Sequence, residues 1–104
     1  MSERTFKTGD AGDRFGATLT AEALDLTGSS VRFVMSQVPT GKVIEGTAQN
    51  DEGTHVFYEF TEDDLDTPGA YRGEWEVTWP GPPPVVLTFP EDGFHDLRVI
   101  ADAD

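Results

Sequence analysis

The chain has 104 residues, the length of one small domain, and its 20 acidic residues against 7 basic ones give a formal net charge of -13. Such a surface repels nucleic acid phosphates and anionic membranes, so a general role in binding either is excluded. Because the chain contains no cysteine, it has no disulfide, no thiolate zinc site and no cysteine nucleophile.

The composition also indicates where the protein is made. The N-terminal residues lack the apolar stretch of a signal peptide, and no run approaches the roughly 20 apolar residues that span a bilayer. We therefore expect synthesis in the cytoplasm. Lys7 and Lys42 are the only lysines. A lysine-poor acidic surface is favoured by high salt, which screens repulsion between carboxylates. We expect a halophilic protein, with an acidic protein from a GC-rich genome as the alternative.

Alternating apolar and polar residues predict β-strands along the chain. In chain order, strands are expected at residues 15–20, 31–36, 42–48, 56–60, 69–79, 85–89 and 94–100. The pattern is longest at residues 69–79, which we therefore place centrally. The pattern at residues 42–48 is weaker and predicts an edge strand, where Lys42 and Glu45 discourage pairing with other chains.

Gly, Pro, Asn and Asp residues punctuate these strands and predict the turns. They cluster at residues 9–12, 27–30, 39–41, 50–53, 68–69, 80–84 and 90–93. One helical turn is expected at residues 61–65, with Thr61 as its N-cap. The pattern predicts an all-β fold, an immunoglobulin-like antiparallel β-sandwich of about seven to eight strands with no disulfide. Residues 1–104 form one domain, with residues 1–12 and 101–104 expected as extended arms that order on docking.

A short segment before the longest strand sharpens the fold prediction. Immunoglobulin-like sandwiches often place a tyrosine just after a tight turn, with its hydroxyl bonded back to the preceding loop. Tyr71 occupies this position. Pro68 fixes φ, Gly69 allows a positive φ, and Asp66 can accept hydrogen bonds from turn amides. We therefore assign Asp66, Pro68, Gly69 and Tyr71 to a structural corner.

No set of residues predicts catalysis. His55 and His95 are expected at the surface, and the chain has no phosphate loop, nucleophile elbow or zinc-protease motif. We expect neither an enzyme nor a cofactor, with a small hydrolase as a remote alternative. Acidic residues 62–66 and 10–13 are weak candidates for Ca²⁺. Because they lack the spacing of a calcium loop, solvated loops without metal are expected.

Three residues are candidates for an interface with another protein. Trp79 lies next to a proline, and tryptophans at such positions are common anchors, although a second core tryptophan fits equally. Lys42 and Ile44 lie on the predicted edge strand, which could pair with another chain by strand addition. The proline-rich residues 81–84 are expected to form a stiff hairpin loop rather than a polyproline ligand.

As a set, these motifs resemble the immunoglobulin-like N-terminal domain of the upper baseplate proteins of tailed phages and small virion structural proteins related to it. The matching segments are residues 9–10, 15–20, 25–35, 64–77 and 88–94. The resemblance implies a non-enzymatic virion structural protein, an accessory or adaptor subunit of the tail, baseplate or head that docks on a larger scaffold. No coiled coil or receptor-binding tip follows the domain, so a small subunit is expected rather than a fibre.

The resemblance also implies partners and a location. The expected partners are other virion proteins, in a homo-oligomeric or arrayed assembly, without nucleic acid or membrane. The expected location is the virion, and the acidic composition suggests a virus of a halophilic archaeon. A capsid decoration protein is one alternative. The other is a carbohydrate or host-surface binding module that uses Trp79 and Tyr58.

Overall fold

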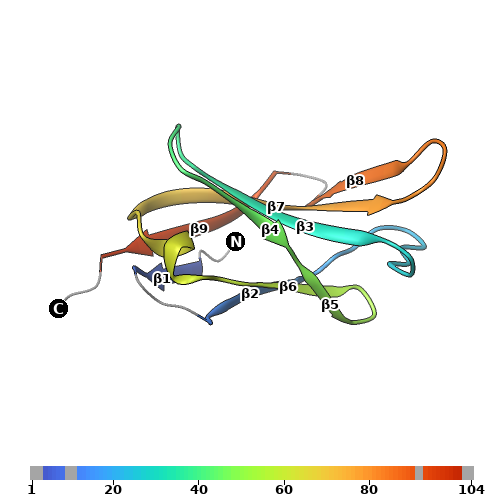
Figure 1. The fold of residues 1–104 in the computed structure, drawn as a ribbon, viewed down its shortest axis with the longest axis horizontal. Helices are drawn as coiled ribbons and strands as arrows, with labels where there is room; N and C mark the ends of the chain where they lie inside the picture. Colours follow the sequence, from blue (N-terminus) through green and yellow to red (C-terminus); the bar gives the residue numbers. More distant parts are fainter. Residues whose placement is uncertain (1–3, 9–11, 91–92, 102–104) are drawn as a thin grey trace.

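Two β-sheets pack face to face in the computed structural model, which describes residues 4–8, 12–90 and 93–101 (Figure 1). The larger sheet has the strand order β1-β9-β7-β3-β4, with β8 also paired to β7, and the smaller sheet has the order β2-β6-β5. No helix in this part of the chain is long and apolar enough to cross a membrane. The elements are β1 (Arg4–Lys7), β2 (Arg14–Thr18), β3 (Ser30–Gln37), β4 (Val43–Thr47), β5 (Gln49–Glu52), β6 (His55–Glu59), the 3₁₀ turn η1 (Glu62–Leu65), β7 (Gly69–Trp79), β8 (Val85–Phe89) and β9 (His95–Ile100).

The alternating sequence pattern determines which face of each strand is buried. In β7, Tyr71, Trp75 and Val77 point into the core, while Arg72 between them is exposed. β3 pairs antiparallel with β7 over its whole length and places Phe33 opposite Trp75. Because successive side chains point to opposite faces of a strand, one apolar face of the sheet is available for packing.

Aromatic rings join the two sheets across the core. Phe15 of β2 stacks on Trp75 of β7, with ring centroids 5.7 Å apart and an interplanar angle of 10°. Phe33 of β3 stacks on Tyr58 of β6 at 5.3 Å. Each such pair stabilises the fold by about 0.5–1.5 kcal/mol beyond the effect of burying its area. The core therefore holds the sheets together without a disulfide.

The expected β-sandwich is confirmed, and several of its details are confirmed with it. β7 has the predicted bounds and lies centrally, between β3 on one side and β8 and β9 on the other. β4 is an edge strand of the larger sheet. The predicted helical turn is η1, with Thr61 as its N-cap.

Two strands were not predicted, and each corrects an expectation. β1 lies within the segment expected as an arm, but Phe6 is buried and the strand pairs with β9. This pairing is parallel, so the larger sheet is mixed rather than wholly antiparallel. β5 overlaps a predicted turn, and all four of its residues are exposed. Within the predicted arms, residues 1–3, 9–11 and 102–104 lie outside the described residues.

Candidate functional site

The predicted corner lies between η1 and the start of β7. The hydroxyl of Tyr71 donates a 2.6 Å hydrogen bond to the main-chain carbonyl of Thr67, which is the bond that the sequence predicts. Gly69 has a φ of +147°, a conformation that favours glycine, directly after Pro68. The Thr67 hydroxyl donates a 2.8 Å hydrogen bond to the carboxylate of Asp66. The corner therefore fixes the direction in which the chain enters the central strand.

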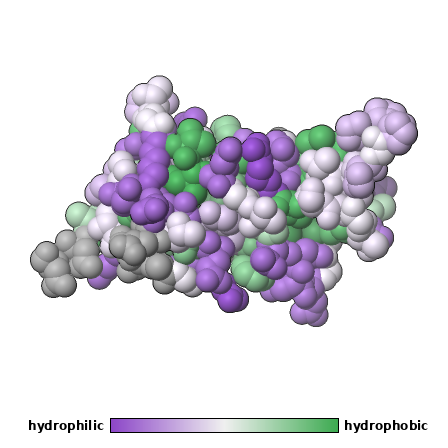
Figure 2. Space-filling view, viewed as in Figure 1, coloured by the Kyte–Doolittle hydropathy of each residue, from purple (hydrophilic) through white to green (hydrophobic). Residues whose placement is uncertain are grey.

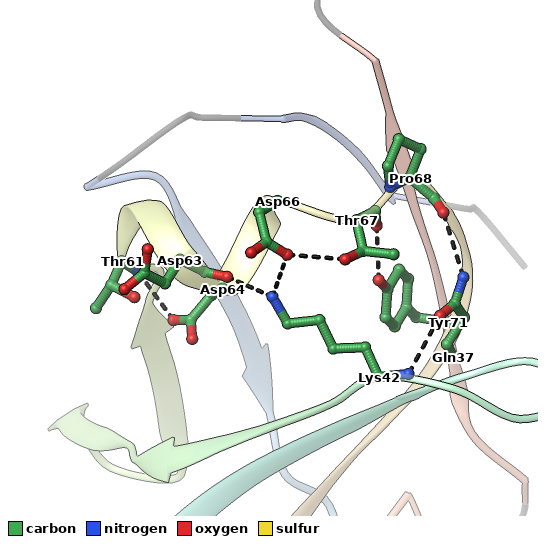
Figure 3. Close-up of polar contacts among 9 residues, drawn as sticks. All are labelled: Gln37, Lys42, Thr61, Asp63, Asp64, Asp66, Thr67, Pro68 and Tyr71. Atoms are coloured by element: carbon green, nitrogen blue, oxygen red, sulfur yellow. Dashed lines mark hydrogen bonds and ion pairs between the residues drawn. The ribbon is translucent and has the colours of Figure 1, made fainter.

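Lys42, a predicted interface residue, is engaged within the chain at this corner (Figure 3). Its ammonium group donates hydrogen bonds to the Asp66 carboxylate and to the main-chain carbonyl of Asp63. Its main-chain N–H donates to Gln37 Oε1 at 3.2 Å, and Gln37 Nε2 donates to the carbonyl of Pro68 at 3.3 Å. The hydrogen bond from Lys42 is the main reason why the pKa of Asp66 is lowered. The side chain of Lys42 is only 26% exposed and ties the β3–β4 hairpin to the corner.

Replacing Tyr71 with phenylalanine is expected to lower the free energy of unfolding by about 1–2 kcal/mol, because the carbonyl of Thr67 loses its hydrogen-bond donor. Urea denaturation followed by circular dichroism measures this loss. Thr67→Ala is the matched control, since it keeps the main-chain carbonyl and the corner bond. Thr67→Ala also removes the hydrogen bond from the Thr67 hydroxyl to Asp66, so its loss measures that bond separately. If Tyr71→Phe is as stable as the unmodified protein, the tyrosine hydroxyl is not what holds the corner.

The remaining aromatic and edge-strand candidates differ in burial. Ile44 is only 2% exposed, so its side chain packs in the core rather than facing a partner. Tyr58 is buried, and its hydroxyl donates to Asp64 at 2.8 Å, so the ring is not available to a sugar. Trp79 is half-buried at the end of β7 and donates its indole N–H to the carbonyl of Asp25 at 3.2 Å. Of these aromatic candidates, Trp79 alone reaches the surface.

The acidic residues after β6 are used in hydrogen bonds within the chain. Asp64 accepts hydrogen bonds from the Tyr58 hydroxyl and, at 2.9 Å, from the main-chain N–H of Thr61. Asp66 is held by Lys42. Over residues 4–8, 12–90 and 93–101, no group of three or more His, Asp or Glu side chains is placed to hold a metal ion. The other acidic candidate, residues 10–13, lies partly outside the described residues.

The two histidines lie in different environments, which corrects the expectation that both are surface residues. His55 has a 42% exposed side chain and contacts Asp51, with Nδ1 and Oδ1 2.8 Å apart. His95 is half-buried beside Phe15, and its Nε2 accepts a 3.0 Å hydrogen bond from the indole N–H of Trp75. Because burial disfavours the charged imidazolium, the pKa of His95 is lowered from its usual 6.5.

The lowered pKa of His95 predicts how stability depends on pH. In the unfolded chain His95 binds a proton at about pH 6.5, and in the folded chain it does so only at a lower pH. The contribution of neutral His95 to the free energy of unfolding is therefore complete above pH 6.5. It is lost as the pH falls through the folded-state pKa. Urea titrations between pH 8 and pH 5 should show this decline. In His95→Gln, which can still accept the Trp75 hydrogen bond, the decline should be smaller. An equal decline in both proteins would exclude His95 as its source.

β8 differs from the other strands because three consecutive side chains at its start are both apolar and exposed, while Phe89 at its end is buried. Val85, Val86 and Leu87 are 53%, 50% and 42% exposed. One edge of β8 pairs with β7, and no strand among the described residues pairs with the other edge. Figure 1 shows the β7–β8 hairpin projecting from one end of the molecule, and Figure 2 shows green, hydrophobic surface inward of the pale tip at that end.

An apolar groove runs beside β8. It has a volume of about 330 Å³ and is lined by Trp79, Val85, Leu87 and residues 21–25. Trp79 is therefore part of the same surface as the exposed strand. The residues that line the groove include two acidic ones, Glu22 and Asp25. We call β8 and this groove the β8 surface.

The free edges of the sandwich differ in charge. β8 carries none along residues 85–89. Charged residues lie on each of the other edge strands, namely Arg4 and Lys7 on β1, Arg14 on β2, Glu45 on β4, and Asp51 and Glu52 on β5. Charged side chains on an edge strand discourage pairing with another chain. Among the described strands, β8 is therefore the edge best suited to accept one.

Sequence reasoning predicted the strand at residues 85–89 but not its role as a surface. The available signal was three consecutive apolar residues, 85–87, in a segment between Pro84 and Pro90 that contains no charged residue. Comparisons with family models, curated proteins and solved structures found no match. We therefore infer function from the surfaces of this chain and from the motifs quoted above.

Proposed function

We propose that this protein is a non-enzymatic structural subunit of a tailed-virus particle, which assembles with neighbouring virion proteins through the β8 surface. The observation that carries the proposal is the uncharged, exposed edge of β8 in a protein with a net charge of -13. The virion assignment itself is supported by the resemblance to small immunoglobulin-like virion proteins. The tyrosine corner is part of that resemblance, since Tyr71 lies in one of the matching segments.

The β8 surface has the chemistry of a strand-addition site. An unpaired edge offers main-chain N–H and C=O groups to an incoming strand, and these supply affinity. The exposed side chains of Val85 and Leu87 and the adjacent groove offer apolar contact that is lost from water on docking. The partner therefore gains directional hydrogen bonds and hydrophobic contact at one place.

The acidic surface has a different role in this proposal. Away from the corner its ion pairs are exposed, as in the contacts of Arg32 with Glu45 at 3.2 Å and with Glu76 at 3.7 Å. Exposed pairs of this kind add little to stability. Excess carboxylates keep free subunits apart and soluble, and salt screens their repulsion. Assembly at an uncharged edge is then favoured at high salt, in keeping with the proposed halophilic host.

Mass spectrometry of purified tailed particles tests the proposal. The protein should be present at a fixed ratio to the major particle proteins, and its absence from particles would overturn the proposal. Labelling of intact particles with an antibody would then distinguish a tail or baseplate position from a decoration protein on the head. Glycan binding by the isolated domain, lost on Trp79→Ala, would instead support the carbohydrate-binding alternative.

Two variants test whether incorporation into particles depends on the β8 surface. Leu87→Lys places a charge on the free edge and is expected to reduce incorporation at least about tenfold, because a charged side chain on an edge opposes strand pairing. Val43→Lys is the matched control, since Val43 is, like Leu87, an exposed aliphatic residue on an edge strand, β4. Incorporation of both variants at the level of the unmodified protein would show that another surface mediates docking.

A further inference from the structure

We infer that the partner of the β8 surface is β8 of a second copy of this chain, paired antiparallel about a two-fold axis beside Leu87. This inference rests on the proposed function and identifies the partner that docks at the free edge of β8. A two-fold interface requires a surface that is complementary to itself.

β8 satisfies this condition: its sequence is uncharged throughout, its residues Val85–Thr88 are exposed, and Phe89 at its end is buried in the core of its own copy. With Leu87 opposite its own equivalent, Val85 faces Phe89 of the second copy, and Val86 faces Thr88 of the second copy. Every facing pair is uncharged, and the pairs on the Leu87 face are wholly apolar. Cross-strand apolar pairs of this kind stabilise a sheet. The exposed surface of both Leu87 side chains would also be reduced.

Two of the other edge strands of the larger sheet, β4 and β1, fail the same test. Antiparallel self-pairing of β4 about its centre places Glu45 opposite Glu45 of the second copy. Self-pairing of β1 about its centre places Arg4 opposite Lys7 of the second copy. Like charges directly opposite each other destabilise a strand pair. The sequence of the described edge strands therefore permits self-pairing at β8 and opposes it at β1 and β4.

The charge around β8 gives the dimer a distinctive dependence on salt. Glu22 and Asp25 line the groove, and the whole chain is acidic, so two copies repel each other at low ionic strength. Salt screens this repulsion and leaves the uncharged strand contact intact. Association should therefore strengthen as salt is added. A partner that presents a basic segment to Glu22 and Asp25 would show the opposite dependence.

Sedimentation equilibrium of the full chain measures this association. A five-residue strand pair buries less area than a standard interface, so the dissociation constant should be on the order of 0.1 mM at high salt. Dissociation constants that fall as salt rises would support the inference. A chain that stays monomeric at millimolar concentration and molar salt would overturn it. So would a dimer that weakens with salt.

Charge variants at position 87 test the register of the pair. Leu87→Lys and Leu87→Glu should each raise the dissociation constant at least about tenfold, because each places like charges opposite one another. A mixture of the two variants should form a heterodimer, since lysine then faces glutamate. Val43→Lys should dimerise like the unmodified chain. Circular dichroism confirms folding of each variant, which the 42% exposure of Leu87 favours.

The dimer and the virion role can each be contradicted without the other. Failure of the Lys and Glu variants to associate with each other would overturn the pairing at Leu87. A monomeric protein that is nevertheless found in particles would remove the dimer and leave the virion role. A dimer of the predicted register that is absent from particles would remove the virion role and leave the dimer.

Discussion

Replacing Trp75 with alanine is expected to lower the free energy of unfolding by about 3–5 kcal/mol. That is a large fraction of the roughly 5–15 kcal/mol that typically stabilises a domain. Trp75 is fully buried, faces Phe33 on the neighbouring strand and stacks on Phe15 of the other sheet. The variant also leaves Nε2 of His95 without its indole donor. Urea denaturation followed by circular dichroism measures the loss independently of tryptophan fluorescence.

The second tryptophan is the matched control. Trp79 lies four residues later on the same strand, but it is half-buried and borders an open groove. Trp79→Ala should cost about 1–2 kcal/mol, since much less apolar area is removed from the interior. Equal losses for the two variants would contradict the assignment of Trp75 to the centre of the core and Trp79 to its margin.

Replacing Gly46 with alanine is expected to lower the free energy of unfolding by about 1–3 kcal/mol, because an added methyl group would overpack the core. A Cβ atom at this position would lie 2.7 Å from Cε1 of Tyr58 and 3.0 Å from its hydroxyl oxygen. The ring cannot move freely, since Phe33 and Phe60 pack against it and Asp64 holds its hydroxyl. Urea denaturation measures the loss.

A double-mutant cycle identifies the contact responsible. Tyr58→Leu removes the ring that the new methyl group meets, so the cost of Gly46→Ala should shrink in that background. Gly81→Ala is the control at a surface loop, where the nearest atom to an added Cβ is 3.3 Å away. Strict additivity of Gly46→Ala and Tyr58→Leu would show that the loss has another origin.

The fold could be predicted from sequence wherever one face of a strand is buried. β3 and β7 show this most clearly, because their apolar residues recur at every second position. β5 could not be found, since all its residues are exposed and nothing alternates. β1 has one apolar residue, Phe6, whose burial depends on β9 at the other end of the chain.

Sites could be predicted from the sequence where their contacts join residues that are close together in the chain. The corner bond joins Tyr71 to a carbonyl four residues earlier, so a short motif was enough. The contacts of Lys42 with Asp63 and Asp66 span 21 and 24 residues, and no local pattern indicates them. The exposure of β8 depends on which strands cover it, and that is decided by the topology of the whole sheet. The sequence therefore indicated the strand but not its free edge.

The parallel pairing of β1 with β9 has a mechanical consequence. Arg4 lies beside Leu97, and Ile100 lies beside Lys7, so the two strands run in the same direction. A force that draws Arg4 and Ile100 apart pulls the strands along each other in opposite directions. It shears the ladder and loads its hydrogen bonds together rather than one after another. Under tension, the lifetime of the fold depends on its unfolding rate, and this short ladder at the margin of the sheet carries the load before the aromatic core does.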